Sequence, residues 1–236
     1  MYLKIIATFV LIAWYFLPVY SQQNTFNENL SSSSIKMFDA NGKPFVNPNI
    51  DIAGSPYFID GWKYGSVTLN DNTTYSKRQL RVNFQTQQVH YLSENNVEMT
   101  LQAGAVKAVV LLDSGKIPFM QYNFQSGFPK IDNQDETFLY KLICNGKIKM
   151  LESTRKKIIE DKNEFAGTVN KEFRAYEDYY IYFNTEIVRL KKSQQFFLDM
   201  MSDKSKAVEK FIEADNTNFK KTDGIKKLVD YYNSIQ

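Results

Sequence analysis

Apolar side chains alternate with polar ones through much of residues 50–190. Leu80, Val82 and Phe84 should face one side of an extended chain, and Arg81 and Asn83 the other. The same alternation recurs in residues 67–69, 89–91, 97–101, 120–124 and 138–142. Short alternating runs without intervening helices are typical of half-buried antiparallel strands. We therefore predict a mainly β domain over residues 50–190, built as an antiparallel meander or a partly open barrel.

The turns and one apolar run add detail to this pattern. Residues 106–112 are apolar on both faces, which predicts a strand that is covered on each side. Asn145-Gly146 predicts a hairpin with a type I′ turn, because both residues tolerate positive φ. Asn184-Thr185 predicts a second hairpin, between residues 179–183 and 186–190. Residues 152–177 are highly charged and contain a glycine that interrupts any helical face, so we predict that they are mostly loop.

Residues 191–236 change to the helical period of 3.6. Phe196, Phe197 and Met200 would share one face of a first short helix. Ser202 is expected to cap a second helix, and Thr222 or Asp223 a third. The apolar stripes of these two helices are Ala207, Val208, Phe211 and Ile212, then Ile225, Leu228, Val229 and Tyr232. We predict that two or three short helices pack on the β-domain, which makes the fold α+β; docking on a partner protein or a membrane is the alternative.

The N-terminus has the layout of a secretory signal peptide. Lys4 begins a short basic region, residues 5–17 are almost wholly apolar, and Val19-Tyr20-Ser21 places small residues before the cleavage point. This run is shorter than the roughly 20 residues that span a bilayer, so we predict that residues 1–21 are removed and leave no transmembrane segment. The protein would then be exported, to the periplasm or outside the cell. Residues 22–49 are polar and rich in Ser and Asn, which predicts a linker or N-terminal arm.

Charge and cysteine content narrow the class of protein. Loss of the signal peptide leaves 28 basic and 26 acidic side chains, a net charge of +2, which argues against a nucleic-acid partner. Cys144 is the only cysteine, so the chain cannot form an internal disulfide. Among exported proteins, this favours a bacterial periplasm or cell surface. Aromatic residues make up 15% of the chain, which fits a sheet-rich core.

Nucleophilic catalysis by a Cys–His pair would have to use Cys144 and His90, the only residues of their kinds. Cys144 is in step with Tyr140 and Leu142, which indicates a small buried core residue. His90 falls on the strand face opposite Val89, which indicates a solvent-facing residue. One cysteine and one histidine cannot supply the three or four ligands of a zinc site, so we expect no metal and no other cofactor.

Acidic residues form no recognisable catalytic or metal-binding motif, so we assign no catalytic, cofactor-binding or metal-binding residue. Residues 132–136 carry several acids but lack the glycine and distal glutamate of a calcium loop. Asp113-Ser114-Gly115-Lys116 lacks the spacing of a phosphate-binding loop and is predicted to be a turn. A glycosidase needs only two carboxylates, which leaves this class open. The acids near such a role, Glu152, Glu160, Asp161 and Glu164, have no distinguishing spacing.

Four short motifs resemble a group of uncharacterised exported bacterial envelope proteins. They are Gly54-Ser55-Pro56-Tyr57, Val67-Thr68-Leu69-Asn70-Asp71, Leu80-Arg81-Val82-Asn83 and Lys227-Leu228-Val229-Asp230-Tyr231-Tyr232-Asn233. The resemblance covers roughly residues 50–235 and implies a signal peptide, a β-rich middle and a helical C-terminus. It implies a location in the bacterial envelope and brings no activity, cofactor or site residue.

Two functions follow from these observations. The first is an exported envelope protein that binds a partner protein or an apolar ligand through an aromatic-rich β-surface, without catalysis. The second is a carboxylate-dependent hydrolase that acts on glycan in the envelope. A binding protein should have an apolar cavity or an exposed aromatic patch, whereas a hydrolase should have paired acids with shifted pKa values in a cleft. We favour the first.

Overall fold

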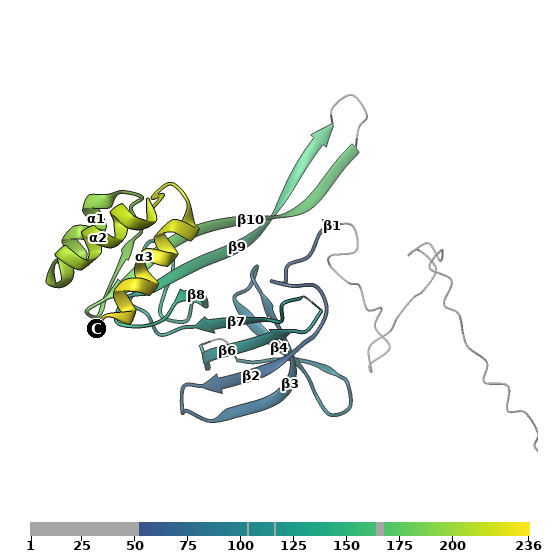
Figure 1. Ribbon diagram of the computed structural model, residues 1–236. Helices are drawn as coiled ribbons and strands as arrows, with labels where there is room; N and C mark the ends of the chain where they lie inside the picture. Colours follow the sequence, from purple (N-terminus) through teal and green to yellow (C-terminus); the bar gives the residue numbers. More distant parts are fainter. Residues whose placement is uncertain (1–51, 103, 116, 164–167) are drawn as a thin grey trace, which may run out of the picture. The chain divides into compact units, whose positions relative to one another are not determined.

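The computed structural model of the protein describes residues 52–236 except 103, 116 and 164–167. The predicted signal peptide and N-terminal arm lie outside the described residues. Within the described part, the chain forms an 11-stranded open sheet followed by three α-helices, which confirms the predicted α+β fold (Figure 1). The pairings are antiparallel apart from that between the first and tenth strands.

The strands follow one another closely along the chain. They are β1 (Ile52–Ala53), β2 (Lys63–Leu69), β3 (Thr74–Asn83), β4 (Gln88–Leu92), β5 (Glu98–Thr100), β6 (Val106–Asp113), β7 (Met120–Gln125), β8 (Tyr140–Cys144), β9 (Lys149–Asn163), β10 (Thr168–Phe183) and β11 (Glu186–Arg189). Their order in the sheet is β1-β10-β9-β8-β7-β6-β2-β3-β4-β5, and β11 pairs with β10. The helices are α1 (Gln194–Met200), α2 (Ser205–Asp215) and α3 (Thr222–Ser234), with a 3₁₀ turn at Ser202–Lys204.

Strands β9 and β10 show that the predicted loop at residues 152–177 is wrong. They form a long hairpin that extends away from the helices (Figure 1). Much of this hairpin is exposed on both faces, so it lacks the apolar alternation that reveals a half-buried strand. Its charges lie instead in cross-strand pairs such as Lys171 with Glu160, whose Nζ and Oε1 atoms are 2.9 Å apart. Such opposite-charge pairs stabilise a ribbon without a buried face.

Strands β2–β7 enclose one apolar core, where the predicted alternation is confirmed. Leu80, Val82 and Phe84 on β3 are all buried in it. Phe58 covers this core from the segment that precedes β2; its ring packs edge-on against Phe124 and at a tilt against Phe84. The Lys156 ammonium on β9 holds that segment by donating to the carbonyls of Ser55 and Tyr57, at 2.9 and 2.5 Å. The prediction for residues 106–112 is only half right, because one face of β6 is buried and the other is half-buried.

The helical tail covers a second core at the far end of the sheet. Its stripe residues Val208, Ile212, Ile225, Leu228, Val229 and Tyr232 are buried together with Cys144, Ile148, Met150 and Ile181 from the strands. This confirms that the tail packs on the β-domain. The predicted caps are wrong: Ser202 begins the 3₁₀ turn, and Thr222 is the first residue of α3. Ser193, in contrast, caps α1 by accepting a hydrogen bond from the Phe196 N–H.

The Asn145-Gly146 hairpin is confirmed, but its predicted turn type is wrong. Residues 145–148 join β8 to β9, and neither Asn145 nor Gly146 has a positive φ. Gly146 is needed for a different reason, since a Cβ there would lie 2.5 Å from the Cγ atom of Asn233 on α3. The glycine therefore lets the last helix approach the strand connection.

Candidate ligand-binding pocket

A β-bulge in the β2–β3 hairpin creates the most promising site. Gly65 pairs with Arg78 and Ser66 pairs with Ser76, so Lys77 is an extra residue on β3. Lys77 has a φ of 54°, a left-handed conformation that is uncommon for a side chain of this size. The bulge changes the phase of the strand, which brings Tyr75 and Arg78 to the same face although they are three positions apart in the sequence.

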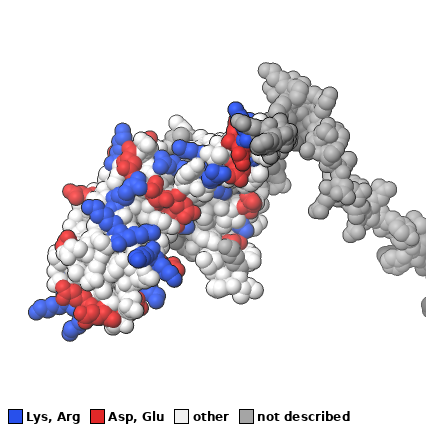
Figure 2. Space-filling model, turned by 90° about the horizontal axis from the view of Figure 1, so that it is seen from above, with Lys and Arg blue, Asp and Glu red and all other residues white. Residues whose placement is uncertain are grey.

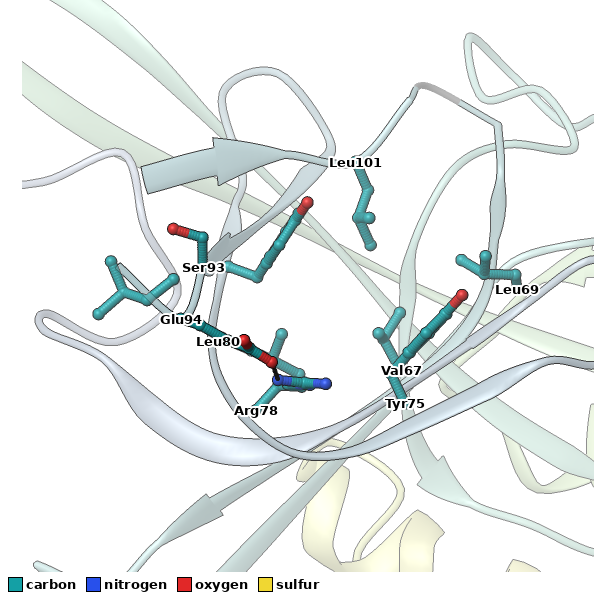
Figure 3. A pocket seen from close by; sticks show the side chains of 10 residues that line it. Val67, Leu69, Tyr75, Arg78, Leu80, Ser93, Glu94 and Leu101 are labelled. Carbon is teal, nitrogen blue, oxygen red and sulfur yellow. Dashed lines mark ion pairs between the residues drawn. The ribbon is translucent and has the colours of Figure 1, made fainter. Parts of the chain in front are cut away.

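This face lines a pocket with a volume of about 390 Å³ (Figure 3). Its lining includes Val67 and Leu69 of β2 and Tyr75 and Leu80 of β3. Leu101, in the segment after β5, lines the pocket as well. The remaining lining residues are Arg78, Tyr91, Leu92, Ser93 and Glu94. The volume lies within the 300–1,000 Å³ of typical small-molecule sites, and such sites are mostly apolar with a few polar groups. The pocket therefore has the size and chemistry of a binding site for an apolar molecule.

The two charged side chains of the pocket lie at one side. Arg78 Nη1 lies 3.9 Å from Glu94 Oε1, and the two side chains are 43% and 89% exposed (Figure 3). Glu94 belongs to the turn between β4 and β5, which is closed by hydrogen bonds of Ser93 to the Val97 backbone. An exposed ion pair of this length adds little stability. Arg78 and Glu94 are therefore held near the pocket mainly by the β-bulge and the turn.

The opposite face of β3 and β4 carries a cluster of stacked and charged side chains. The Arg81 guanidinium lies over the rings of Tyr57 and Trp62, at 3.8 and 4.3 Å from their centroids. Glu98 Oε2 accepts from Arg81 at 2.6 Å, and its Oε1 lies 2.6 Å from His90 Nδ1. His90 also stands edge-on to Tyr57. These contacts join β3, β4 and β5 to the segment that precedes β2.

Neighbouring charges and burial shift the pKa values of two groups in this cluster, the Glu98 carboxyl and the Tyr57 phenol. Desolvation alone would raise the pKa of the Glu98 carboxyl, but hydrogen bonds from Arg81 and His90 outweigh it and the pKa lies below its usual value. Burial raises the pKa of the Tyr57 phenol. Both groups therefore keep their ordinary charge states at neutral pH. The buried Arg81 Nε and His90 Nε2 atoms have no hydrogen-bond partner within the described chain.

Cys144 and His90 do not form a catalytic pair. Strands β7, β6, β2 and β3 separate β8, which carries Cys144, from β4, which carries His90. Cys144 is a buried core residue as predicted, and burial together with Asp230 raises the pKa of its thiol, so it stays protonated. It is not in step with Tyr140, however, because a bulge between Leu142 and Cys144 turns it toward the helices.

The prediction that His90 faces solvent is wrong. Its side chain is only 13% exposed, because Tyr57 and Glu98 cover it. The face of the strand was predicted correctly, since Val89 lies in the opposite core and His90 does not. Sequence reasoning missed that Tyr57, before β2, and Glu98, on β5, would cover this face of β4.

The acidic segments have structural roles. Asp132 accepts hydrogen bonds from Tyr180 and Arg189, which hold the pKa of its carboxyl below the usual range. Asp135 accepts a hydrogen bond from the Thr137 backbone N–H. Asp113 pairs with Lys63 at 2.8 Å and accepts from the Gly115 N–H, which confirms that residues 113–116 are a turn as far as they are described. Glu152 pairs with Lys141 at 2.5 Å. No group of three potential metal ligands occurs among the described residues.

The surface carries no large field of one sign on the face that Figure 2 draws. Lys and Arg side chains are interspersed there with Asp and Glu side chains (Figure 2). This agrees with the nearly neutral net charge of the chain. In the described part of the chain, no helix has the length and hydropathy needed to cross a bilayer.

Comparisons with protein-family models, with curated proteins and with solved structures found no match to this chain.

Proposed function

We propose that this protein is an exported envelope protein that binds an apolar ligand in the pocket between β2, β3 and β4, without catalysis. The observation that carries the proposal is the pocket itself, which has a volume of about 390 Å³ and is lined mainly by Val, Leu and Tyr side chains. Removing apolar ligand surface from water into such a space is favourable, by roughly 25 cal/mol per Å². The lining needs no rearrangement to provide this surface.

The titration of the acids supports binding over hydrolysis of glycan. A glycosidase needs one carboxyl with a raised pKa as general acid beside a second, ionised carboxylate. Every described carboxyl with a resolved shift has a pKa below its usual value: Asp71, Glu98, Asp132, Asp135, Glu160 and Asp203. Each of these acids accepts hydrogen bonds from donors that favour the ionised form. The pocket itself contains a single acid, Glu94.

Titration with the neutral fluorescent probe N-phenyl-1-naphthylamine tests the proposal. We expect saturable binding to the mature protein and competition by long-chain alcohols. Leu101→Trp fills the pocket and should weaken probe binding by tenfold or more, a loss of about 1.4 kcal/mol. Val188→Trp is the matched control, because Val188 lies partly exposed on β11 and outside the pocket lining.

A second control separates the pocket from exposed apolar surface. Phe119 is 56% exposed in the β6–β7 connection, next to the fully exposed Ile117. Hydrophobic probes also bind such surface patches. Phe119→Ser should leave probe affinity unchanged if the probe occupies the pocket. Loss of binding in Phe119→Ser with retention in Leu101→Trp would contradict the proposal and point to a surface site for a partner protein.

A further inference from the structure

We infer that the ligand is an anionic amphiphile of the fatty-acid type, whose carboxylate pairs with Arg78 in place of Glu94. This inference rests on the proposed function, because it names the class of ligand for the same pocket. Arg78 and Glu94 are the only charged residues among those that line the pocket. The head group of a ligand must therefore meet one of these two charges or remain in water.

Arg78 is the better anchor of the two. Its side chain is 43% exposed, whereas that of Glu94 is 89% exposed, so a ligand in the pocket meets the guanidinium first. A guanidinium presents two parallel N–H donors that match a carboxylate, and this geometry favours bidentate pairing. The β-bulge at Lys77 is the feature that directs Arg78 toward the pocket. A cationic head group would instead have to pair with Glu94, whose side chain lies largely in water, and would be repelled by Arg78.

Glu94 has the properties of a counter-ion that is readily exchanged. Its separation of 3.9 Å from Arg78 contrasts with the 2.6 Å between Arg81 and Glu98 on the other face of the same strands. The Arg81–Glu98 pair is packed between aromatic rings and shared with His90, while the Arg78–Glu94 pair has neither support. Displacing Glu94 into water therefore breaks only a long, solvent-exposed ion pair.

The apolar part of the pocket fixes the direction of the ligand. Leu69 and Leu101 lie on the sides of the pocket away from Arg78 and Glu94 (Figure 3). A ligand with its carboxylate on Arg78 would place its alkyl chain against these leucines and against Val67. The pocket thus has the Arg78–Glu94 pair at one end and leucine side chains at the other, and displacement of Glu94 would leave a cationic end that matches the polarity of a fatty acid.

The test compares dodecanoate, dodecanol and dodecyltrimethylammonium, below their micellar concentrations, as competitors of N-phenyl-1-naphthylamine. For the unmodified protein we expect dodecanoate to bind at least fivefold more tightly than dodecanol, and the ammonium compound most weakly. Arg78→Gln should remove the preference for dodecanoate and leave dodecanol affinity unchanged. Glu94→Gln should strengthen dodecanoate binding, because it removes the competing anion, again without effect on dodecanol. Arg174→Gln is the control, since Arg174 is an exposed residue of β10 that pairs with Glu172.

The outcomes distinguish the inference from the proposed function. Equal affinity for dodecanoate and dodecanol, or weaker dodecanoate binding in Glu94→Gln, would overturn the inference and leave the apolar site standing. Failure of all three compounds to compete would overturn both. Loss of dodecanol binding in Arg78→Gln would show that Arg78 only maintains the shape of the pocket, which also overturns the inference.

Discussion

The side-chain amide of Asn233 pairs with the backbone of Ile148 as a neighbouring strand would. Its Oδ1 accepts from the Ile148 N–H at 2.9 Å, and its Nδ2 donates to the Ile148 carbonyl at 2.8 Å. Ile148 is buried in the connection between β8 and β9, immediately before β9, and its backbone N–H and carbonyl pair with the Asn233 amide. One residue of α3 therefore satisfies both groups and ties the last helix to the sheet.

Asn233→Ala should lower the free energy of unfolding by about 1–3 kcal/mol, because it leaves a buried donor and acceptor unpaired. Chemical denaturation measures this loss. Lys206→Ala is the control on the same helical tail, since Lys206 is exposed on α2. Equal stabilities for Asn233→Ala and the unmodified protein would mean that water replaces the amide.

Gly146→Ala should destabilise the protein through the same contact. The new Cβ would lie 2.5 Å from Asn233 Cγ, and relieving this overlap should cost about 1–3 kcal/mol. The two substitutions should not be additive, since Asn233→Ala removes the atoms that clash. A double-mutant cycle measured by denaturation should give a coupling of about 0.5–3 kcal/mol. Additive losses would show that Gly146 is needed for its backbone and not for Asn233.

Sequence patterns predicted the elements with one buried face. Leu80, Val82 and Phe84 were assigned correctly to one face because the opposite face of β3 is polar. The stripe of α3 was assigned correctly for the same reason, since the charged positions of the helix remain exposed. Hydrophobic burial against one surface produces a periodic pattern, and this pattern can be read without knowing the partner surface.

The remaining elements depend on information that periodicity does not carry. Outside their buried ends, β9 and β10 carry charged residues on both faces over residues 155–162 and 169–177, and these parts pair with each other. Tyr75 and Arg78 share a face only because Lys77 is a bulge, which a strict period of two assigns to opposite faces. The bulge before Cys144 has the same effect. Periodicity alone therefore does not reveal the pocket, although Val67, Leu69 and Leu80 in its lining belong to alternating runs.

The helical tail should be required for folding of the β-domain. Truncation after Leu190 would expose Cys144, Ile148, Met150 and Ile181, which the helices now cover. We expect the truncated protein to aggregate or to unfold at a markedly lower temperature, as measured by circular dichroism and size-exclusion chromatography. A soluble monomer with unchanged melting temperature would contradict this and assign the tail to an external partner.

Single substitutions in the tail should reduce stability by amounts that follow how deeply each side chain is buried. Leu228→Ala should lower the free energy of unfolding by about 2–5 kcal/mol, because Leu228 is fully buried on the inner face of α3. Phe211→Ala should cost less, since Phe211 is only half-buried and stacks on Tyr231 at the edge of the core, with ring centroids 4.3 Å apart. Denaturation of the two variants measures the difference. A larger loss for Phe211→Ala would mean that the stacked pair carries the packing.

The Arg81 cluster should make stability depend on pH through Glu98. The pKa of this carboxyl is lower in the folded protein than its usual value, because Arg81 and His90 outweigh its desolvation. A group of this kind stabilises the fold above its unfolded pKa, which is about 4.3, and the stabilisation is lost as pH falls through the folded pKa. Glu98→Gln should therefore be less stable than the unmodified protein near neutral pH, and the difference should close in acid. Melting temperatures measured from about pH 7 to about pH 3 give this difference.

Salt provides an independent check on the same residue. Glu98 is 41% exposed at its side chain, so its pairs with Arg81 and His90 are partly screened. The difference in melting temperature between the unmodified protein and Glu98→Gln should shrink when salt is raised at neutral pH. Glu136→Gln is the control, because Glu136 is exposed in the connection between β7 and β8. A difference that is independent of both pH and salt would show that Glu98 acts through packing against Tyr57 and not through its charge.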